Sequence, residues 1–285
     1  MGAVRAPAVE EAMSNRTILV IPCYNEARRL DVAAVATLLE DDAVDLIVVD
    51  DGSTDETHDI LEGFARSWPR RVRALPLAEN QGKAEAVRRG MIAAIEAGAG
   101  IVGYLDADLA TPAPEMLRLI ALLRGSDAQV LVGARVGLLG HDIERSPLRH
   151  YLGRVFATLA SIALDMRVYD TQCGAKLFRA SDALVDAVRE PFLSRWAFDV
   201  ELFGRLFSGS PTAAPIPAAG VWEEPLHTWR DVKGSKLSPR QMARALTDLA
   251  RIARDLADRR AQRGLAADRA PAAPAHDLEP ARVSR

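Results

Sequence analysis

Two aspartates one residue apart follow an apolar segment in GYLDADLATP, residues 103–112. In an extended chain, residues i and i+2 face the same way, so Asp106 and Asp108 can direct both carboxylates to one place. Two like charges at that spacing repel each other, and a divalent cation removes the repulsion. Mg²⁺ and Mn²⁺ take hard oxygen ligands, so the pair predicts a metal site completed by substrate phosphates. The alternative is an Asp turn that caps the helix beginning near Pro112.

Three further polar clusters occur in this half of the chain: PCYNE (22–26), DDGSTDE (50–56) and NQGK (80–83). Asp50 or Asp51 would accept hydrogen bonds from a base or a ribose. Lys83 and nearby backbone N–H groups would hold phosphate at a helix N-terminus. Neither a Walker A loop nor a G-x-G-x-x-G follows the first strand. The pattern predicts a nucleotide and a metal held without either common phosphate loop, whereas ordinary turn chemistry accounts for each cluster taken singly.

The elements that must position these clusters alternate in type. Hydrophobic patterning predicts strands at 16–23, 45–51, 72–78, 100–108 and 128–135, and helices at 26–42, 55–68, 82–98 and 113–125. This alternation predicts an α/β fold with a mostly parallel central sheet and helices on both faces. Ligands bind beyond the carboxyl ends of such strands, so all the clusters are expected to meet on one edge.

The second half of the chain is less regular. It predicts helices at 146–166, 184–190, 196–209 and 240–260, and a polar turn followed by a short strand at 170–180. The helix at 240–260 is basic and amphipathic. Residues 209–239 are expected to be a loop followed by extended or irregular chain.

Composition narrows the class of protein. The chain has 285 residues, is 49% hydrophobic and 26% charged, and carries a net charge of −3, which is ordinary for a soluble globular protein. No apolar run is long enough for a transmembrane helix, and the N-terminus lacks the apolar region of a signal peptide. Cys23 and Cys173 fit neither a metal motif nor a disulfide framework, so reduced, buried thiols are expected.

Charge is distributed unevenly along the chain. Acidic residues predominate over residues 1–134 and basic residues over 135–260. An acidic half suits a metal, and a basic half suits an anionic partner or a membrane surface. Unevenly solvated faces are the alternative. No nucleic acid partner is expected.

Several quoted segments carry a family resemblance. VIPCYNEARRL, VVDDGSTDET, NQGKAEAVRRGM and YLDADLATP, in this order, resemble the inverting family-two glycosyltransferases of the GT-A fold. ERSPLRHYLGR, DTQCGAKLFRA, RWAFDVEL and GSKLSP resemble more narrowly the dolichyl- or polyprenyl-phosphate β-glucosyltransferases, relatives of dolichyl-phosphate mannose synthase. The resemblance spans residues 17–240. It departs in two respects: Ala110 stands where the mannose synthases place a Gln, and neither the membrane anchor nor the C-terminal helices often found in the family are expected here.

The resemblance implies an activity and its partners. A hexose, glucose from UDP-glucose, would pass to a polyprenyl phosphate with Mg²⁺ or Mn²⁺ as cofactor. The protein would be cytoplasmic and peripheral at the cytoplasmic face of the membrane. The chain would divide into a disordered leader (1–15), a GT-A domain (16–261) and a disordered tail (262–285). The domain would comprise a nucleotide-sugar half (16–134) and an acceptor half (135–261), the latter with an irregular segment and the C-terminal amphipathic helix.

The resemblance also implies site residues. Those assigned to the nucleotide are Pro22, Tyr24, Asn25, Glu26, Asp50, Asp51, Gly82, Lys83, Asp106 and Ala107. The acceptor phosphate would need cations, for which Arg135, Arg145 and Arg149 are candidates, with a solvated helix face as their alternative. The residues assigned to catalysis are Asp108, Asp170 and Asp199, and the metal ligands are Asp106 and Asp108.

Some roles remain open at the level of sequence. Asp170 is either a base or a residue that orients an arginine, although a phosphate monoester is already anionic and needs little help from a base. Asp199 and Glu201 either reach sugar hydroxyls or form structural ion pairs. The helices at 147–164 and 239–260 lie at a bilayer surface or pack on the core. The alternative functions are a saccharide or small-molecule acceptor, mannosyl transfer from GDP-mannose, a non-catalytic nucleotide-sugar-binding module and a nucleotidyltransferase.

Overall fold

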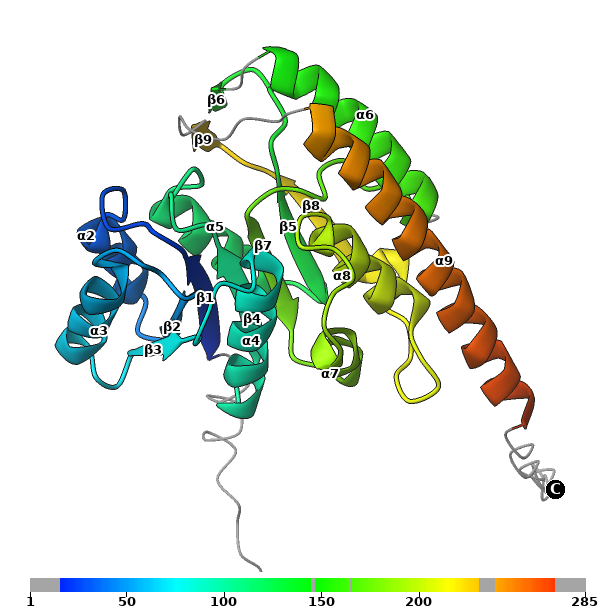
Figure 1. Ribbon diagram of the computed structural model, residues 1–285, viewed down its shortest axis with the longest axis horizontal. Helices are drawn as coiled ribbons and strands as arrows, with labels where there is room; N and C mark the ends of the chain where they lie inside the picture. Colours follow the sequence, from blue (N-terminus) through cyan, green and yellow to red (C-terminus); the bar gives the residue numbers. More distant parts are fainter. Residues whose placement is uncertain (1–15, 145–146, 165, 231–238, 270–285) are drawn as a thin grey trace, which may run out of the picture.

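A single seven-stranded sheet forms the centre of the protein, as seen in the computed structural model, which describes residues 16–144, 147–164, 166–230 and 239–269 (Figure 1). The strand order is β3-β2-β1-β4-β7-β5-β8. These strands are β1 (Thr17–Cys23), β2 (Val44–Asp50), β3 (Val72–Pro76), β4 (Ile101–Leu105), β5 (Val130–Ala134), β7 (Ala175–Arg179) and β8 (Val221–Pro225). Two short strands, β6 (Asp142–Glu144) and β9 (Thr228–Arg230), pair separately and parallel to each other.

Helices cover both faces of the sheet, as the sequence predicted (Figure 1). Ile18 and Val20 of β1 pack into the core beneath one layer, whereas Leu19 and Ile21 pack into the core of the other layer. This two-residue alternation with both faces buried explains why β1 reads as a continuous apolar run.

The two layers contain different helices. One face packs against α4 (Lys83–Glu96), α6 (Pro147–Leu164), α7 (Asp182–Arg189), α8 (Phe198–Ser208) and α9 (Pro239–Arg269). The other face packs against α2 (Val32–Ala36), the 3₁₀ turn η1 (Thr37–Glu40), α3 (Thr57–Ser67) and α5 (Ala113–Arg124). A further 3₁₀ turn, η2 (Ala218–Gly220), precedes β8.

Strand direction in the sheet is mostly parallel, which confirms the expected class. β1 pairs parallel with β2 and β4, β2 with β3, and β5 with β8. The exception is β7, which lies antiparallel between β4 and β5. Its direction brings the polar turn that precedes it, residues 170–174, to the edge where β4 ends.

Two helix boundaries differ from the expectation. The helix expected at 26–42 is reduced to α2 and η1, because Asp31 caps α2 by accepting a hydrogen bond from Ala34 N–H at 2.9 Å. The last helix, α9, continues past residue 261 to Arg269 through QRGLAADR, a stretch without proline that contains the good helix formers Ala, Arg, Gln and Leu. The expected leader (1–15) and the remainder of the expected tail (270–285) lie outside the described residues.

Candidate active site at the carboxyl edge of the sheet

The carboxyl ends of β1, β2 and β4 carry the expected polar clusters, and hydrogen bonds join the loops that follow the first two. The Asn25 backbone N–H donates to Ser53 Oγ at 3.0 Å, and the Thr54 N–H donates to Asn25 Oδ1 at 2.8 Å. Asn25 has φ of 52°, a left-handed conformation in which Asn is enriched. The two loops therefore form one continuous wall beside the ends of the strands.

The other β1 residues assigned to the nucleotide lie on the same wall. Pro22 is the penultimate residue of β1, and Tyr24 is exposed just beyond the end of the strand. The Glu26 carboxylate forms an ion pair with Arg29, with 2.7 Å between Oε1 and Nη2. Burial and the neighbouring Asp108 raise the pKa of Glu26 and the Arg29 contact lowers it, with a net increase.

The Asp51 carboxylate is buried and binds the chain that leads into α4. Its oxygens accept hydrogen bonds from the backbone N–H groups of Gln81 and Gly82, both at 2.8 Å, and from Asn80 Nδ2 at 3.0 Å. Burial raises the pKa of Asp51 more than these hydrogen bonds lower it. Asp51 thus holds the NQGK segment against the end of β2.

Asp50 is similarly engaged. It accepts a hydrogen bond from Ser53 N–H at 3.0 Å and contacts His58 Nδ1 at 3.2 Å. Directly after the two aspartates, Gly52 has φ of 64°, and a Cβ there would lie 2.4 Å from the carbonyl carbon of Glu79. The structure therefore places Asp50 and Asp51 at the predicted edge, with carboxylates that organise the loops.

Lys83 and Asp106 form an ion pair at this edge, with 2.5 Å between Nζ and Oδ1. Their side chains are 42% and 31% exposed, although Asp106 Oδ1 itself is buried. Burial acts to raise the pKa of Asp106, but the charges of Lys83, Lys176 and Arg135 outweigh it and lower that pKa. For Lys83 the effects are reversed. Burial acts to lower its pKa, but the carboxylates around it, Asp106 foremost, outweigh burial and raise that pKa.

Asp108 lies close enough to Asp106 for the two charges to interact. Burial and then the Asp106 charge raise the pKa of Asp108, although its Oδ1 accepts a hydrogen bond from Ala110 N–H at 3.1 Å. Both aspartates lie in the turn after β4, which ends at Leu105, and not in the extended strand that the sequence predicted. Leu109, which follows Asp108 in this turn, has φ of 49°. Asp108 thus forms an Asx turn, but this turn does not cap α5, whose N-cap Pro112 has no side-chain hydrogen bond. The charge repulsion that a cation would relieve is also present. Ala107, between the two carboxylates, is buried.

The donor set here fits a hard cation such as Mg²⁺ or Mn²⁺. Asp106 and Asp108 offer only carboxylate oxygens, and the repulsion between them is what a divalent ion neutralises. Within the described residues, no group of three or more His, Cys, Asp or Glu side chains is arranged to hold a metal. A cation at this pair would need further oxygen ligands from outside the chain.

Residues 170–174 approach Asp106 from β7. The Asp106 N–H donates to the Gly174 carbonyl at 3.2 Å. A Cβ on Gly174 would lie 2.2 Å from Asp106 Oδ2 and 2.3 Å from its Cγ. The glycine of the DTQCG segment is thus required for the close approach of this turn to the aspartate.

Arg135 and Asp170 form a bidentate pair beyond the end of β5. Arg135 Nε and Nη2 lie 2.6 and 2.7 Å from the two oxygens of Asp170, and the Arg135 backbone N–H adds a bond at 3.1 Å. The Arg135 guanidinium also lies 5.3 Å from the centre of the Trp229 ring. Asp170 therefore orients an arginine, which is one of the two roles left open by the sequence.

Asp199 lies in a buried cluster below the edge. Its Oδ1 accepts a hydrogen bond from the Tyr104 hydroxyl and lies 2.9 Å from Lys176 Nζ. Lys176 also donates to the Cys173 carbonyl. Burial and Asp199 raise the pKa of Tyr104 well above its usual value, which keeps its hydroxyl a donor. Lys176 was not among the predicted site residues, although a charged residue inside the apolar strand β7 is a signal visible in the sequence.

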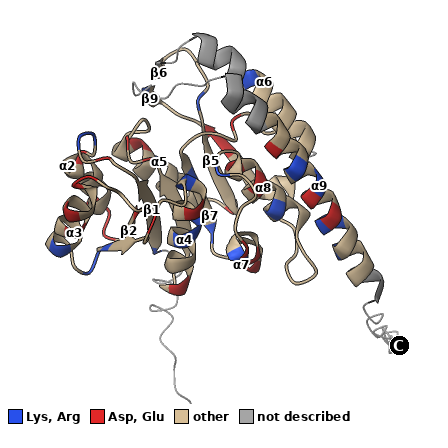
Figure 2. Cartoon of the chain, viewed as in Figure 1, with Lys and Arg blue, Asp and Glu red and all other residues tan. Residues whose placement is uncertain are grey.

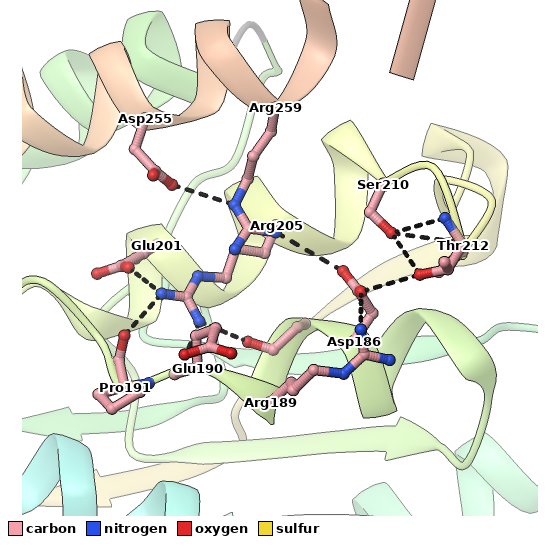
Figure 3. A network of polar contacts seen from close by, with 12 residues as sticks. Asp186, Arg189, Glu190, Pro191, Glu201, Arg205, Ser210, Thr212, Asp255 and Arg259 are labelled. Carbon is pink, nitrogen blue, oxygen red and sulfur yellow. Dashed lines mark hydrogen bonds and ion pairs between the residues drawn. The ribbon is translucent and has the colours of Figure 1, made fainter. Parts of the chain in front are cut away.

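Glu201 belongs to a different network, which also contains Arg205, Glu190 and Pro191 (Figure 3). It is fully buried and forms an ion pair with Arg205 at 2.5 Å, and Leu193 N–H donates to it at 2.8 Å. Arg205 donates to the carbonyls of Glu190 and Pro191 at 2.7 and 2.9 Å. Glu201 thus occupies the structural ion pair that the sequence left open.

Two of the expected acceptor-side arginines cannot be placed. Arg145 lies outside the described residues, and Arg149 is in α6 within the part whose side chains are not described. Further along α6, Phe156, Ala160 and Leu164 pack into the core, whereas Val155 and Ile162 are exposed.

The last helix also packs on the core. In α9, Leu249, Ile252 and Leu256 are buried in the layer that contains α6 and α8, while Lys/Arg and Asp/Glu both occur along the helix (Figure 2). Among the described helices, none combines the length and apolar character needed to cross a membrane.

Known proteins with similar sequences share most of this chain. Dolichyl-phosphate beta-glucosyltransferase of Drosophila melanogaster is 33% identical over 256 residues, which cover 83% of this chain and 73% of the relative. The Homo sapiens protein of the same name is 32% identical over 249 residues, covering 82% of this chain and 73% of that one.

Solved structures share the fold at lower identity. Glucosyl-3-phosphoglycerate synthase from Mycobacterium tuberculosis, in complex with UDP, superposes with a TM-score of 0.61 at 21% identity, covering 89% of this chain and 86% of that chain. The same enzyme with Mn²⁺, UDP-glucose and phosphoglyceric acid gives a TM-score of 0.59 at 21% identity, covering 89% of this chain and 85% of that one. The fold is accordingly the GT-A fold of glycosyltransferases.

The family profile described as glycosyl transferase family 2 matches residues 18–184. That range contains β1, β2 and β4 with their polar ends, the Lys83–Asp106 ion pair, Asp108 and the turn that carries Asp170 and Gly174. Together with the sequence relatives, this match shows that the chain belongs to glycosyl transferase family 2.

Proposed function

We propose that this chain transfers glucose from UDP-glucose, with inversion, to a polyprenyl phosphate of the dolichyl type. The observation that carries the proposal is the extent of the similarity to dolichyl-phosphate beta-glucosyltransferases. It covers 83% of the chain, whereas the general family profile ends at residue 184. The similarity therefore includes chain beyond the nucleotide-sugar half, where an acceptor would bind.

In this proposal the edge of the sheet binds the donor. The loops held by Asn25, Asp50 and Asp51 form the wall for the base and ribose, and Lys83 turns from Asp106 to the diphosphate. A divalent cation on Asp106 and Asp108 would neutralise the charge that develops on the departing diphosphate. Metal dependence is supported by the all-oxygen donor set and the repulsion between the two carboxylates.

The acceptor phosphate is itself the nucleophile. A phosphate monoester carries negative charge near neutral pH, so the reaction needs cations to place it more than a base to deprotonate it. We assign this task to Arg135, oriented by Asp170, and to Arg145 and Arg149. Asp199 already accepts hydrogen bonds from Tyr104 and pairs with Lys176, which supports a positioning role.

To use a lipid acceptor, the protein must bind a membrane surface. Leu138 and Leu139 are exposed on the loop after β5, and Val155 and Ile162 are exposed on α6. We propose that these apolar side chains and the arginines near the start of α6 contact anionic lipid at the cytoplasmic face.

The decisive experiment is a transfer assay with a panel of donors and acceptors. UDP-glucose with a short-chain polyprenyl phosphate should give a β-linked polyprenyl phosphate glucose and UDP in the presence of Mn²⁺. Transfer from GDP-mannose would replace the donor assignment. Transfer to a soluble saccharide, with no binding to anionic liposomes at low salt, would replace the lipid acceptor.

A further inference from the structure

Arg195, the first residue of the RWAFDVEL segment, lies in the loop before α8 beside the donor edge, although no role was predicted for it. A Cβ built on Gly82 would lie 3.3 Å from Arg195 Cδ, 3.5 Å from its Cγ and 3.6 Å from its Nε. The arginine side chain therefore runs across Gly82, next to Lys83. Arg195 is also near enough to Asp51 for its charge to lower the pKa of that carboxyl.

The backbone just before Arg195 is held by the two residues that precede it. Ser194 is buried, and its Oγ accepts a hydrogen bond from Ala197 N–H at 2.8 Å and donates to Asp248 of α9 at 2.7 Å. One residue earlier, Leu193 N–H donates to Glu201 at 2.8 Å. The buried Glu201–Arg205 network of Figure 3 thus anchors the loop from which Arg195 extends.

The next residue anchors the loop to a third helix. The Trp196 ring packs edge-on against Phe156 of α6, with 4.9 Å between the ring centres. The position of the Arg195 backbone is therefore fixed before any ligand binds, which reduces the ordering that binding requires.

The guanidinium of Arg195 has no partner of its own. Within the described part of the chain it forms no hydrogen bond and no ion pair, and the Asp51 oxygens near it already accept bonds from Asn80, Gln81 and Gly82. Other cations of this edge are paired: Lys83 with Asp106, Arg29 with Glu26, and Arg135 with Asp170.

We propose that Arg195 binds the diphosphate of the nucleotide sugar, together with Lys83. A guanidinium matches the geometry of phosphate oxygens with two parallel hydrogen bonds. The edge otherwise presents the carboxylates of Glu26, Asp106 and Asp108, so an anionic donor needs a cation that is not already neutralised. This assignment rests on the proposed nucleotide-sugar donor and adds a binding residue from the acceptor half.

The test compares binding of UDP and of uridine, which lacks phosphate. Calorimetry with Mn²⁺ present should show at least a tenfold weaker affinity for UDP in Arg195→Ala and in Arg195→Gln, and a smaller loss in Arg195→Lys. Uridine, measured by its displacement of UDP, should bind all variants equally. Arg89→Ala, an exposed arginine on α4 outside the site, is the matched control and should leave UDP affinity unchanged.

Two results would overturn the assignment. Equal losses for UDP and uridine would show that Arg195 acts through Asp51 and the nucleoside wall. Unchanged UDP affinity, with a raised KM for polyprenyl phosphate, would move Arg195 to the acceptor. If the protein binds GDP in place of UDP, GDP and guanosine serve as the probe pair, so an error in the proposed donor does not decide the role of Arg195.

Discussion

Gly174 offers a direct test of how the β7 turn controls the active-site carboxylate. In Gly174→Ala, the new Cβ would lie 2.2 Å from Asp106 Oδ2, whereas ordinary contact begins at 3.4 Å. The carboxylate or the turn must therefore move by about 1.2 Å. Gly174 does not have positive φ, so the substitution acts through this contact and not through backbone strain.

The expected effect on catalysis exceeds the effect on stability. A displacement of about 1 Å in a group that positions reactants costs roughly 10²-fold in rate, so kcat/KM should fall by about that factor. Overpacking typically costs about 1–3 kcal/mol, and each kcal/mol lowers the Tm of a domain of this size by roughly 2–4 °C. The variant should therefore remain folded at assay temperature.

The assay is steady-state glucosyl transfer with saturating Mn²⁺, with thermal unfolding followed in parallel. Gly63→Ala is the matched control, because a Cβ there meets only Arg66 Nη2 at 3.8 Å in α3; its kcat/KM should equal that of the wild type. Wild-type kcat/KM in Gly174→Ala would refute the reasoning, since it would show that Asp106 tolerates the displacement or has no part in the reaction.

Three further predictions follow from the same structure. Asp108→Ala should lower kcat/KM by about 10²-fold or more, and EDTA should abolish transfer until Mg²⁺ or Mn²⁺ is restored; turnover in chelator would contradict the metal assignment. Glu201→Leu leaves Arg205 buried without its carboxylate, so stability should fall by about 3 kcal/mol and the melting temperature by roughly 6–12 °C, whereas Glu62→Gln, in an exposed pair, should change neither. Burial raises the pKa of the Cys173 thiol to about 11, so at pH 8 only about one in a thousand of these thiols is the reactive thiolate. The native protein should not react with Ellman's reagent until it unfolds, and rapid reaction of the native state would contradict the burial of both cysteines.

Local pattern was sufficient to predict the elements of the first half of the chain. Each strand from β1 to β5 has a run of β-branched and aliphatic residues, and each polar cluster directly follows such a strand or opens a helix. Parallel strands align their carboxyl ends, so the meeting of Asn25, Asp51 and Asp106 on one edge follows from alternation alone. The type of ligand set at Asp106 and Asp108 also follows from residue chemistry and spacing.

Local sequence pattern did not predict which side chains pair with one another. Asp50 and Asp51 were expected to face a nucleotide, yet their oxygens hold the loops after β2 and before α4. The sequence left Asp199 and Glu201 with the same two possible roles. In the structure, Asp199 pairs with Lys176 below the edge of the sheet, whereas Glu201 forms a buried ion pair with Arg205. They are two residues apart at the start of one helix, where side chains point in different directions.

What the sequence by itself determined is the class of fold, the edge at which the chemistry is placed and the residue types available there. The tertiary structure alone decided that β7 lies antiparallel between β4 and β5, which brings Gly174 against Asp106, and that Arg195 crosses Gly82. These contacts join segments far apart in the chain. Strand order and loop packing depend on the burial of whole layers, so no periodicity within one segment contains them.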